Sequence, residues 1–211
     1  MTEQHPTFLT GPRDAAAYAA MEHTPHDLTV HRSYHALCIA IVGQWNGLRA
    51  AGFEFVASAD DPYACSDDML AAVRTGSVRV FTDGGVTLPR NHPMQASPIA
   101  YGAERATVES GFRTMNDVFR GVHDVMGHYA AHRNDELASF GPIGEYNAWR
   151  RHWLTLPNQA SLALWCETRG QNAYTNFYGN HAELPIAERP YVDQRAGLPQ
   201  LPLLTLVPEG V

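Results

Sequence analysis

The stretch His123-Asp124-Val125-Met126-Gly127-His128 places two imidazoles five positions apart within a helical pattern. A carboxylate, Glu167, directly follows an apolar run at residues 160–166. Two imidazoles and one carboxylate form the facial triad that occupies one face of an octahedral metal and leaves other positions open, as in non-heme Fe(II) oxygenases. We therefore interpret His123, His128 and Glu167 as candidate metal ligands.

The spacing of the two histidines limits how they can reach one ion. Positions i and i+5 lie about 140° apart on an α-helix, so the two rings cannot converge from one regular helix face. We expect the helix to end or to be distorted near Gly127, because glycine tolerates the backbone angles needed there. The spacing also differs from the H-E-x-x-H pattern of zinc proteases. Asp124 is interpreted as a group that orients a ligand.

A structural interpretation of the same residues stays open. The chain has 11 histidines, so close pairs such as His128 and His132 also arise by chance. A helix-end histidine beside a packing glycine would give the same pattern. Glu167 favours the metal interpretation, because an unpaired carboxylate after an apolar run is costly to bury.

Composition excludes several classes of function. A chain of 211 residues with 45% hydrophobic content is long enough for one sizeable core. The net charge of −7 comes without a basic stripe, so we expect no nucleic-acid partner. Without an apolar run that could span a bilayer or target the chain, we expect a cytoplasmic protein with no membrane partner. Three widely separated cysteines argue against a disulfide framework.

Hydrophobic periodicity predicts an α+β, mostly helical fold. Residues 1–30 are expected to form an N-terminal arm with a short helix, and 31–211 a single metal-binding catalytic domain. That domain should begin with a core helix at 31–51 and continue with strands at 53–56 and 77–81 flanking a helix. From about residue 180 the chain is rich in proline and should wrap the domain, with only 201–207 strand-like.

Three further helices are predicted at 104–130, 143–154 and 159–178, with junctions at Gly141-Pro142 and Pro157-Asn158. Each carries a polar stripe. Asp124, Glu145 and His152 are candidates for catalytic or supporting roles on these helices. Aromatic side chains at helical spacing usually belong to the core, but three of them are also candidates for substrate contacts: Trp149, Trp165 and Tyr174.

The histidine motif resembles the H-E-L-L-G-H iron motif of the pterin-dependent aromatic amino acid hydroxylases. The segment 165–170 resembles that family's W-F-T-V-E-F-G segment, which supplies its carboxylate ligand. Upstream, Gly52-Phe53, Ser66-Asp67-Asp68-Met69-Leu70 and Arg79-Val80-Phe81 resemble in order the family's G-F, S-S-R-D-F-L and R-V-F elements. The resemblance covers residues 50–175 and describes a distant, shortened relative.

The resemblance implies the fold of the hydroxylase catalytic core and a bound Fe²⁺ held by His123, His128 and Glu167. It also implies a tetrahydropterin, although the residues between Val56 and Ser66 do not match the segment that cradles the pterin. Arg90 is the nearest match to the arginine that binds the amino-acid carboxylate in this family, and a guanidinium suits that bidentate role. The alternative for Arg90 is a surface arginine in a loop.

The expected function is hydroxylation of an aromatic or amino-acid-like small molecule with dioxygen by a monooxygenase with one iron. A second interpretation counts Glu145 and His152 as additional ligands and gives a two-metal helical oxidase, although the E-x-x-H spacing of ferritin-like proteins is absent. A third is a non-catalytic protein with a structural metal site. The sequence leaves the substrate, the reductant and the oligomeric state open.

Overall fold

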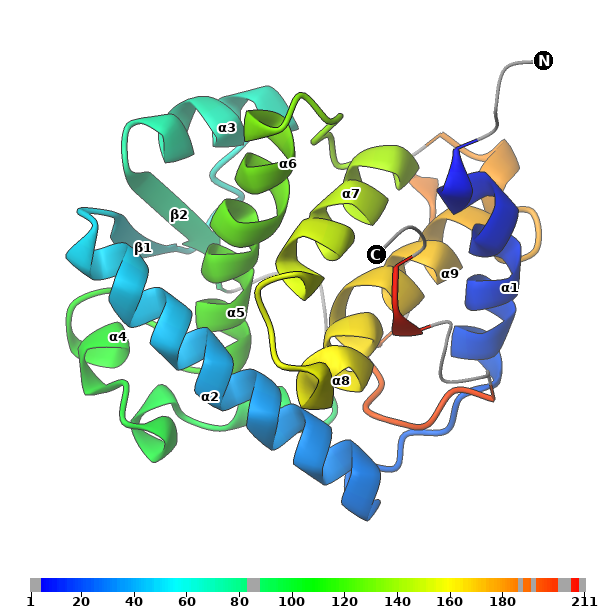
Figure 1. Cartoon of the computed structure of the whole chain (residues 1–211), viewed down its shortest axis with the longest axis horizontal. Coiled ribbons are helices and arrows are strands. Elements are labelled where there is room, and N and C mark those ends of the chain that lie inside the picture. Colours follow the sequence, from blue (N-terminus) through cyan, green and yellow to red (C-terminus); the bar gives the residue numbers. More distant parts are fainter. Residues whose placement is uncertain (1–4, 83–87, 186–187, 191–192, 201–205, 209–211) are drawn as a thin grey trace.

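The computed structural model describes residues 5–82, 88–185, 188–190, 193–200 and 206–208. Helix accounts for 61% of it, and the only sheet in these ranges has two strands, which agrees with the expected mostly helical α+β class. Three helical rods lie side by side, and a long helix crosses one end of them (Figure 1). No helix among the described residues is both long and apolar enough to cross a bilayer.

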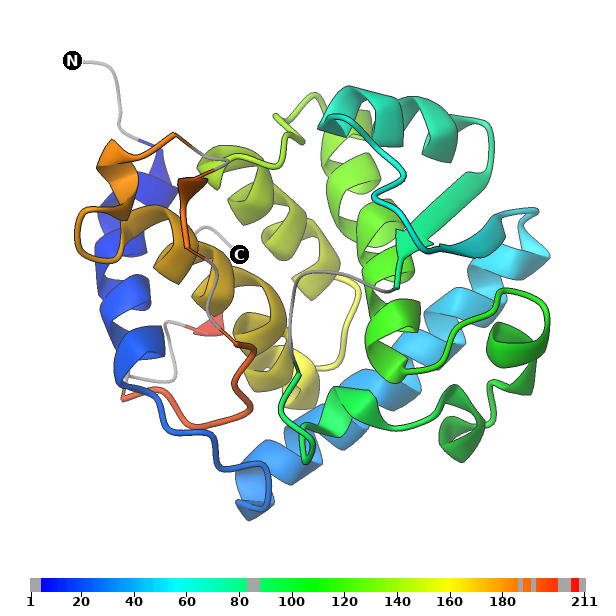
Figure 2. The same ribbon diagram turned by 180° about the vertical axis from the view of Figure 1, so that it is seen from behind.

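The two strands belong to a compact β-α-β unit. Strand β1 (Glu54–Ser58) pairs in parallel with β2 (Ser77–Phe81), and α3 (Ser66–Arg74) connects them. The inward side chains Phe55, Val78 and Val80 are buried, as the alternation of a half-buried strand predicts. Strand β2 ends at Phe81, and this carboxyl end points toward the helical rod that carries the histidine motif (Figure 2).

The first rod is not the continuous helix predicted over 104–130. A short α4 (Glu104–Val108) ends before a turn, and α5 (Met115–His123) begins at a capping box in which Thr114 and Asp117 satisfy each other's backbone N–H groups. The rod then widens into a π-helical turn, Asp124–Tyr129, and closes with α6 (Ala130–Arg133).

The second and third rods lie where the sequence placed them. Helix α7 (Pro142–Trp153) starts at the expected Gly-Pro junction. The third rod comprises α8 (Ser161–Trp165), a second π-helical turn (Cys166–Gly170) and α9 (Gln171–Phe177). Short 3₁₀ turns complete the helical structure at Pro93–Gln95, Pro98–Tyr101, Asn158–Ala160 and His181–Glu183.

Helix α2 (Leu28–Ala50) is the predicted core helix, and the Asp27 carboxylate caps its first turn. Its inward face buries Leu37, Ile41 and Trp45 against the rods. The same helix carries two polar side chains, Tyr34 and Gln44, toward the centre of the molecule. This helix therefore supports both the core and the polar interior.

The described part of the expected N-terminal arm packs against the rest of the fold. Residues 6–20 form α1 (Pro6–Ala20), which lies along α9 (Figure 1). The guanidinium of Arg169 donates to the Asp14 carboxylate over 2.8 Å and to the hydroxyls of Thr7 and Thr10. The interpretation of residues 1–30 as an arm missed this long-range contact, because the partner of Asp14 lies at the far end of the chain.

The proline-rich tail does wrap the fold over its described part. Arg195 donates to the carbonyls of Tyr18, Ala19 and Met21 at the end of α1, and Ala196 donates to His23. Of the strand predicted over 201–207, residues 201–205 lie outside the described ranges.

Candidate metal centre

Three side chains bring one ligand atom each into a common space. They are His123 at the end of α5, His128 on the π-helical turn and Glu145 on α7, and their ligand atoms all lie within 4.8 Å of one another. Both histidines are buried, with 8% and 3% of their surfaces exposed. Metal–ligand distances are about 2.0–2.2 Å, so a small inward movement of the side chains would let one ion contact all three groups.

The π-helical turn explains why a five-residue spacing works. In an α-helix the residues stacked above one another are four apart, whereas the i→i+5 hydrogen bonding of a π-helix stacks residues five apart. The turn at Asp124–Tyr129 therefore carries His128 onto the face that His123 occupies. The sequence predicted a distortion here, and its form is a widened turn rather than a helix end.

The second histidine is held in one tautomer. His128 Nδ1 lies 3.1 Å from the carbonyl oxygen of Ala138, which can only accept, so the proton sits on Nδ1. Nε2 then carries a lone pair and lies 3.7 Å from Glu145 Oε1. A histidine whose other nitrogen donates to a carbonyl is the usual arrangement of a metal ligand.

The first histidine is oriented by a chain of hydrogen bonds. Gln44 Nε2 donates to the Thr155 hydroxyl, so Gln44 Oε1 is the atom that accepts from His152 Nε2 over 3.0 Å. His152 Nδ1 therefore accepts from His123 Nδ1 over 2.9 Å. His123 Nε2 is left as a lone pair, and this buried atom has no hydrogen-bond partner in the protein. An orphaned buried nitrogen beside a second free imidazole and a carboxylate fits a metal ligand.

The carboxylate of the cluster is also held for ligation. Glu145 Oε2 accepts from Asn172 Nδ2 over 2.8 Å, which leaves Oε1 toward the histidines. Burial raises the pKa of Glu145 to about 8, and the nearby Asp124 carboxylate adds to the rise. Burial likewise raises the pKa of Asp124 to about 7, against the effect of Arg120. A divalent cation would offset the cost of both charges.

The cluster opens on a cavity of about 320 Å³. Its walls combine aromatic rings with polar groups, and the residues that line it beside the cluster are Phe81, Asn116, Phe119, Arg120, Asp124, Phe140, Glu167, Thr168, Gln171, Asn172 and Gln194. A second hollow of about 250 Å³ shares five of the lining residues, including Glu145. The ligand atoms thus face a space large enough for a small organic molecule.

Glu167, the carboxylate that the sequence assigned to the metal, is not part of this cluster. It lines the same cavity, but its oxygens accept hydrogen bonds from Tyr34 and Gln194 and lie close to His92. The structure therefore brings together two of the three predicted ligands and adds Glu145 as the carboxylate. Both carboxylate oxygens of Glu167 are therefore engaged by hydrogen-bond donors of the protein.

The remaining predicted residues divide between the site and the core. Asp124 lines the cavity, and His152 accepts a hydrogen bond from His123. None of the four predicted substrate contacts lines the cavity. Trp149 and Trp165 are core residues, Tyr174 stacks on Tyr178 near the surface, and Arg90 is exposed in its loop.

Several residues at the site were not among the candidates. Asn116 and Arg120 share a helical stripe with His123, which was a usable signal. Phe81 at the end of β2 and Gln194 in the tail gave none, because their positions depend on how distant segments pack. Arg120 reaches Phe81 directly, donating to its carbonyl oxygen over 2.7 Å.

Gly127 is required by close packing rather than by unusual backbone angles. A Cβ there would lie 2.9 Å from the Ala148 carbonyl oxygen and 2.9 Å from His123 Cε1. We expect Gly127→Ala to displace the His123 ring and to weaken metal binding about 10- to 100-fold, as for lost supporting contacts. Titration with Mn²⁺ or Co²⁺ measures the change.

Gly47→Ala is the matched control, because a Cβ at Gly47 on α2 meets nothing within 4 Å. It should leave the metal affinity unchanged and raise stability by up to about 1 kcal/mol through helix propensity. Equal metal affinity in both variants would show that the contact between Gly127 and His123 does not position the ligand.

Comparisons of this chain with protein-family models, with curated proteins and with solved structures found no match.

Proposed function

We propose that this protein is a mononuclear non-heme iron oxygenase that hydroxylates an aromatic or amino-acid-like small molecule. The observation that carries the proposal is the convergence of one ligand atom each from His123, His128 and Glu145 at the wall of a cavity. Two imidazoles and one carboxylate leave half of an octahedral ion open, which is the donor set of Fe(II) oxygenases. A ferrous ion held there would supply the activation of dioxygen.

The protein's own residues would bind the substrate and manage protons. Phe81, Phe119 and Phe140 give the cavity apolar walls that suit a ring or alkyl body and exclude water. Asp124, with its pKa raised by burial to about 7, can hold or release a proton near neutral pH. The structure offers no support for a tetrahydropterin, so we propose no role for one.

A single ion is favoured over two. In the two-metal interpretation Glu145 and His152 were extra ligands. Glu145 instead belongs to the first cluster, and both ring nitrogens of His152 are engaged, one by His123 and one by Gln44. Within the ranges that the structure describes, only one group of three or more potential ligands is found. A structural metal site is less favoured, because such sites have saturated coordination spheres.

The kinship with the hydroxylases remains a proposal that rests on the ordered motifs between residues 50 and 175. Its ligand assignment is changed at one position, from Glu167 to Glu145. We propose that the β-α-β unit and the two histidines correspond to the family's core, whereas the carboxylate comes from the preceding rod. A shortened catalytic core is consistent with this difference.

The test combines metal counting with nitric oxide. Reconstitution of the full chain with Fe²⁺ under anaerobic conditions should give one iron per chain. Adding nitric oxide should then produce the electron paramagnetic resonance signal of a high-spin ferrous site with an open position. Two irons per chain would support the two-metal oxidase. Binding of Zn²⁺ but not Fe²⁺, or the absence of the nitric oxide signal, would contradict the oxygenase.

Metal binding should depend on pH through Glu145. Burial lowers the pKa of His128 to about 4 and that of His123 well below its usual value, so both ligands are neutral at pH 6 and release no proton. Glu145, with a pKa of about 8, must lose its proton when the ion binds. We expect the affinity to rise about tenfold per pH unit between pH 6 and 8 and to level off above that.

Calorimetric titration with Mn²⁺ in buffers of different ionisation enthalpy measures the proton count directly. About one proton should be released per ion at pH 6.5, and fewer at pH 9. An affinity that does not change between pH 6 and 8 would contradict ligation by a protonated Glu145.

A further inference from the structure

We propose that Glu167 and Gln194 form a binding site for the ammonium group of a primary amine, at the cavity wall outside the metal cluster. The amine would be the substrate of the proposed oxygenase, and only this assignment as a substrate rests on the proposed function. Binding of the amine can be measured without any oxygenase activity. Three independent features carry it: the contacts of Glu167, its lack of a counter-ion, and unpartnered acceptors in the same cavity.

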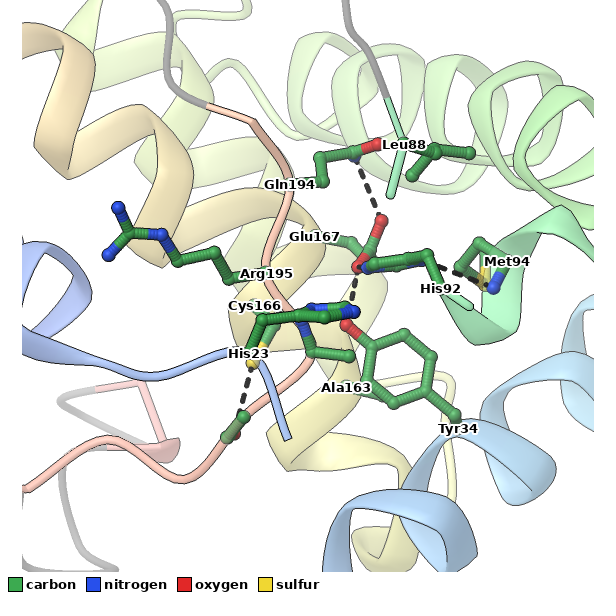
Figure 3. A network of polar contacts seen from close by, with 12 residues as sticks. His23, Tyr34, Leu88, His92, Met94, Ala163, Cys166, Glu167, Gln194 and Arg195 are labelled. Atoms are coloured by element: carbon green, nitrogen blue, oxygen red, sulfur yellow. Dashed lines mark hydrogen bonds and ion pairs between the residues drawn. The ribbon is translucent and has the colours of Figure 1, made fainter. Parts of the chain in front are cut away.

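The contacts of Glu167 involve only uncharged donors (Figure 3). The Tyr34 hydroxyl donates to Oε1 over 2.5 Å and Gln194 Nε2 donates to Oε2 over 2.9 Å. His92 Nε2 lies 3.3 Å from Oε1. Because His92 Nδ1 accepts from the Met94 amide, the His92 proton sits on Nε2 and the ring is neutral. Two uncharged donors thus orient the carboxylate, and the His92 ring lies beside it without a hydrogen bond.

Glu167 also lacks a permanent counter-ion. Every basic residue of the chain other than histidine is an arginine, and all of them fall within the described ranges. No arginine forms an ion pair with Glu167 in those ranges, whereas another buried carboxylate, that of Asp14, is paired with Arg169. The Glu167 side chain is fully buried yet lines the cavity, so a cation that enters the cavity would offset the cost of burying this carboxylate without a counter-ion.

The same cavity presents acceptors without donors. Gln194 is 6% exposed and its Nε2 donates to Glu167, which fixes Oε1 as the remaining atom of the amide. Gln194 Oε1 has no partner in the protein, and neither has Asn116 Oδ1, on a side chain that is 8% exposed. Both residues line the cavity. An ammonium group has three donors and no acceptor, so it matches an anion accompanied by unpartnered oxygens.

The cavity wall beside Glu167 does not favour an anionic ligand. Arg120 lines the cavity beside Asp124, whose charge it partly offsets, and one of its nitrogens donates to Phe81. The aromatic side chains on the walls suit a ring-bearing amine. The chemical class expected is therefore a small primary amine with an apolar or aromatic body.

Calorimetry with three probes that share one body tests this inference. Phenethylamine, 2-phenylethanol and phenylacetate carry a cationic, a neutral and an anionic head group. We expect the Zn²⁺-loaded full chain to bind phenethylamine at least 10-fold more tightly than the other two at pH 7. The metal-free chain should show the same order of affinities for the three probes. This control excludes an amine that binds only by coordinating the metal, because such binding would be lost without the ion.

Glu167→Gln should weaken phenethylamine binding about 10- to 100-fold, because it removes the charge but keeps the shape. It should still bind one metal per chain. Gln194→Met, which removes the unpartnered acceptor and leaves the carboxylate, should weaken binding about 5- to 10-fold. Gln200→Met, at an exposed position of the tail outside the cavity, is the matched control and should change nothing.

Equal binding of amine and alcohol would overturn the inference. So would loss of the metal in Glu167→Gln, which would identify Glu167 as a ligand. If Glu167→Gln does not fold, the affinities of Gln194→Met and Gln200→Met for phenethylamine are compared instead. Equal affinities in these two variants would overturn the inference. A chain that selects the amine but gives no nitric oxide signal would contradict the oxygenase and leave the amine site standing.

Discussion

Glu145→Gln is expected to lower the affinity for Fe²⁺ or Mn²⁺ by more than about 100-fold, beyond the loss typical of supporting residues. The amide keeps the size of the side chain but removes the anionic ligand that faces His128 Nε2 over 3.7 Å. His123→Ala and His128→Ala should also abolish stoichiometric binding. Metal analysis after gel filtration of each reconstituted variant measures the result.

Glu167→Gln is the control for the carboxylate, since it alters a buried acid of the same cavity that lies outside the cluster. It should retain one ion per chain. His132→Ala is the control for the histidines, because His132 is exposed one turn beyond His128. The reverse outcome, metal retained in Glu145→Gln and lost in Glu167→Gln, would restore the ligand set that the sequence predicted.

Arg169→Met is expected to lower the free energy of unfolding by about 3–5 kcal/mol. Arg169 is 3% exposed, donates to Asp14, Thr7 and Thr10, and lies with its guanidinium 5.1 Å from the centre of the Tyr146 ring. Removing it leaves the buried Asp14 carboxylate of α1 with only the half-exposed Arg13 guanidinium, 3.5 Å from its Oδ1, as a counter-ion. Urea denaturation of the metal-free chain measures the loss.

The double variant Asp14→Leu with Arg169→Met should recover most of that loss, because replacing both members of a buried ion pair by apolar groups is often nearly neutral. Arg105→Met removes an exposed i,i+4 pair with Glu109 and should have no measurable effect. A double variant as unstable as Arg169→Met would indicate that the threonine contacts, and not the ion pair, stabilise the docking of α1.

Local patterns predicted most elements of this fold but not their long-range contacts. The helix over α2, the two strands and the Gly-Pro start of α7 follow from periodicity and from turn residues. The docking of α1 depends on a pair formed between Asp14 and Arg169, which no local pattern reveals. The predicted helix over 104–130 failed because the capping box at Thr114 starts a new helix.

The sequence placed the two clustered histidines in the first ligand set, whereas it named Glu145 only as an additional ligand in the two-metal interpretation and chose Glu167 as the carboxylate. The five-residue spacing of His123 and His128 signalled a distorted helix by itself. Glu145 and Glu167 both lie on helical stripes, and the choice between them depends on the neighbours of each carboxylate. Tyr34 from α2 and Gln194 from the tail hold Glu167, whereas Asn172 leaves one oxygen of Glu145 free.

The widened turn between the two histidines also ties the stability of the first rod to its ligand. Helical turns with i→i+5 bonding are rare because they pack the backbone less favourably than an α-helix does. Without an ion, this rod could relax toward the regular helix, in which the two rings point in different directions. A bound cation would stabilise the wide form, so the amide protons of residues 124–130 should exchange more slowly with solvent once the site is loaded.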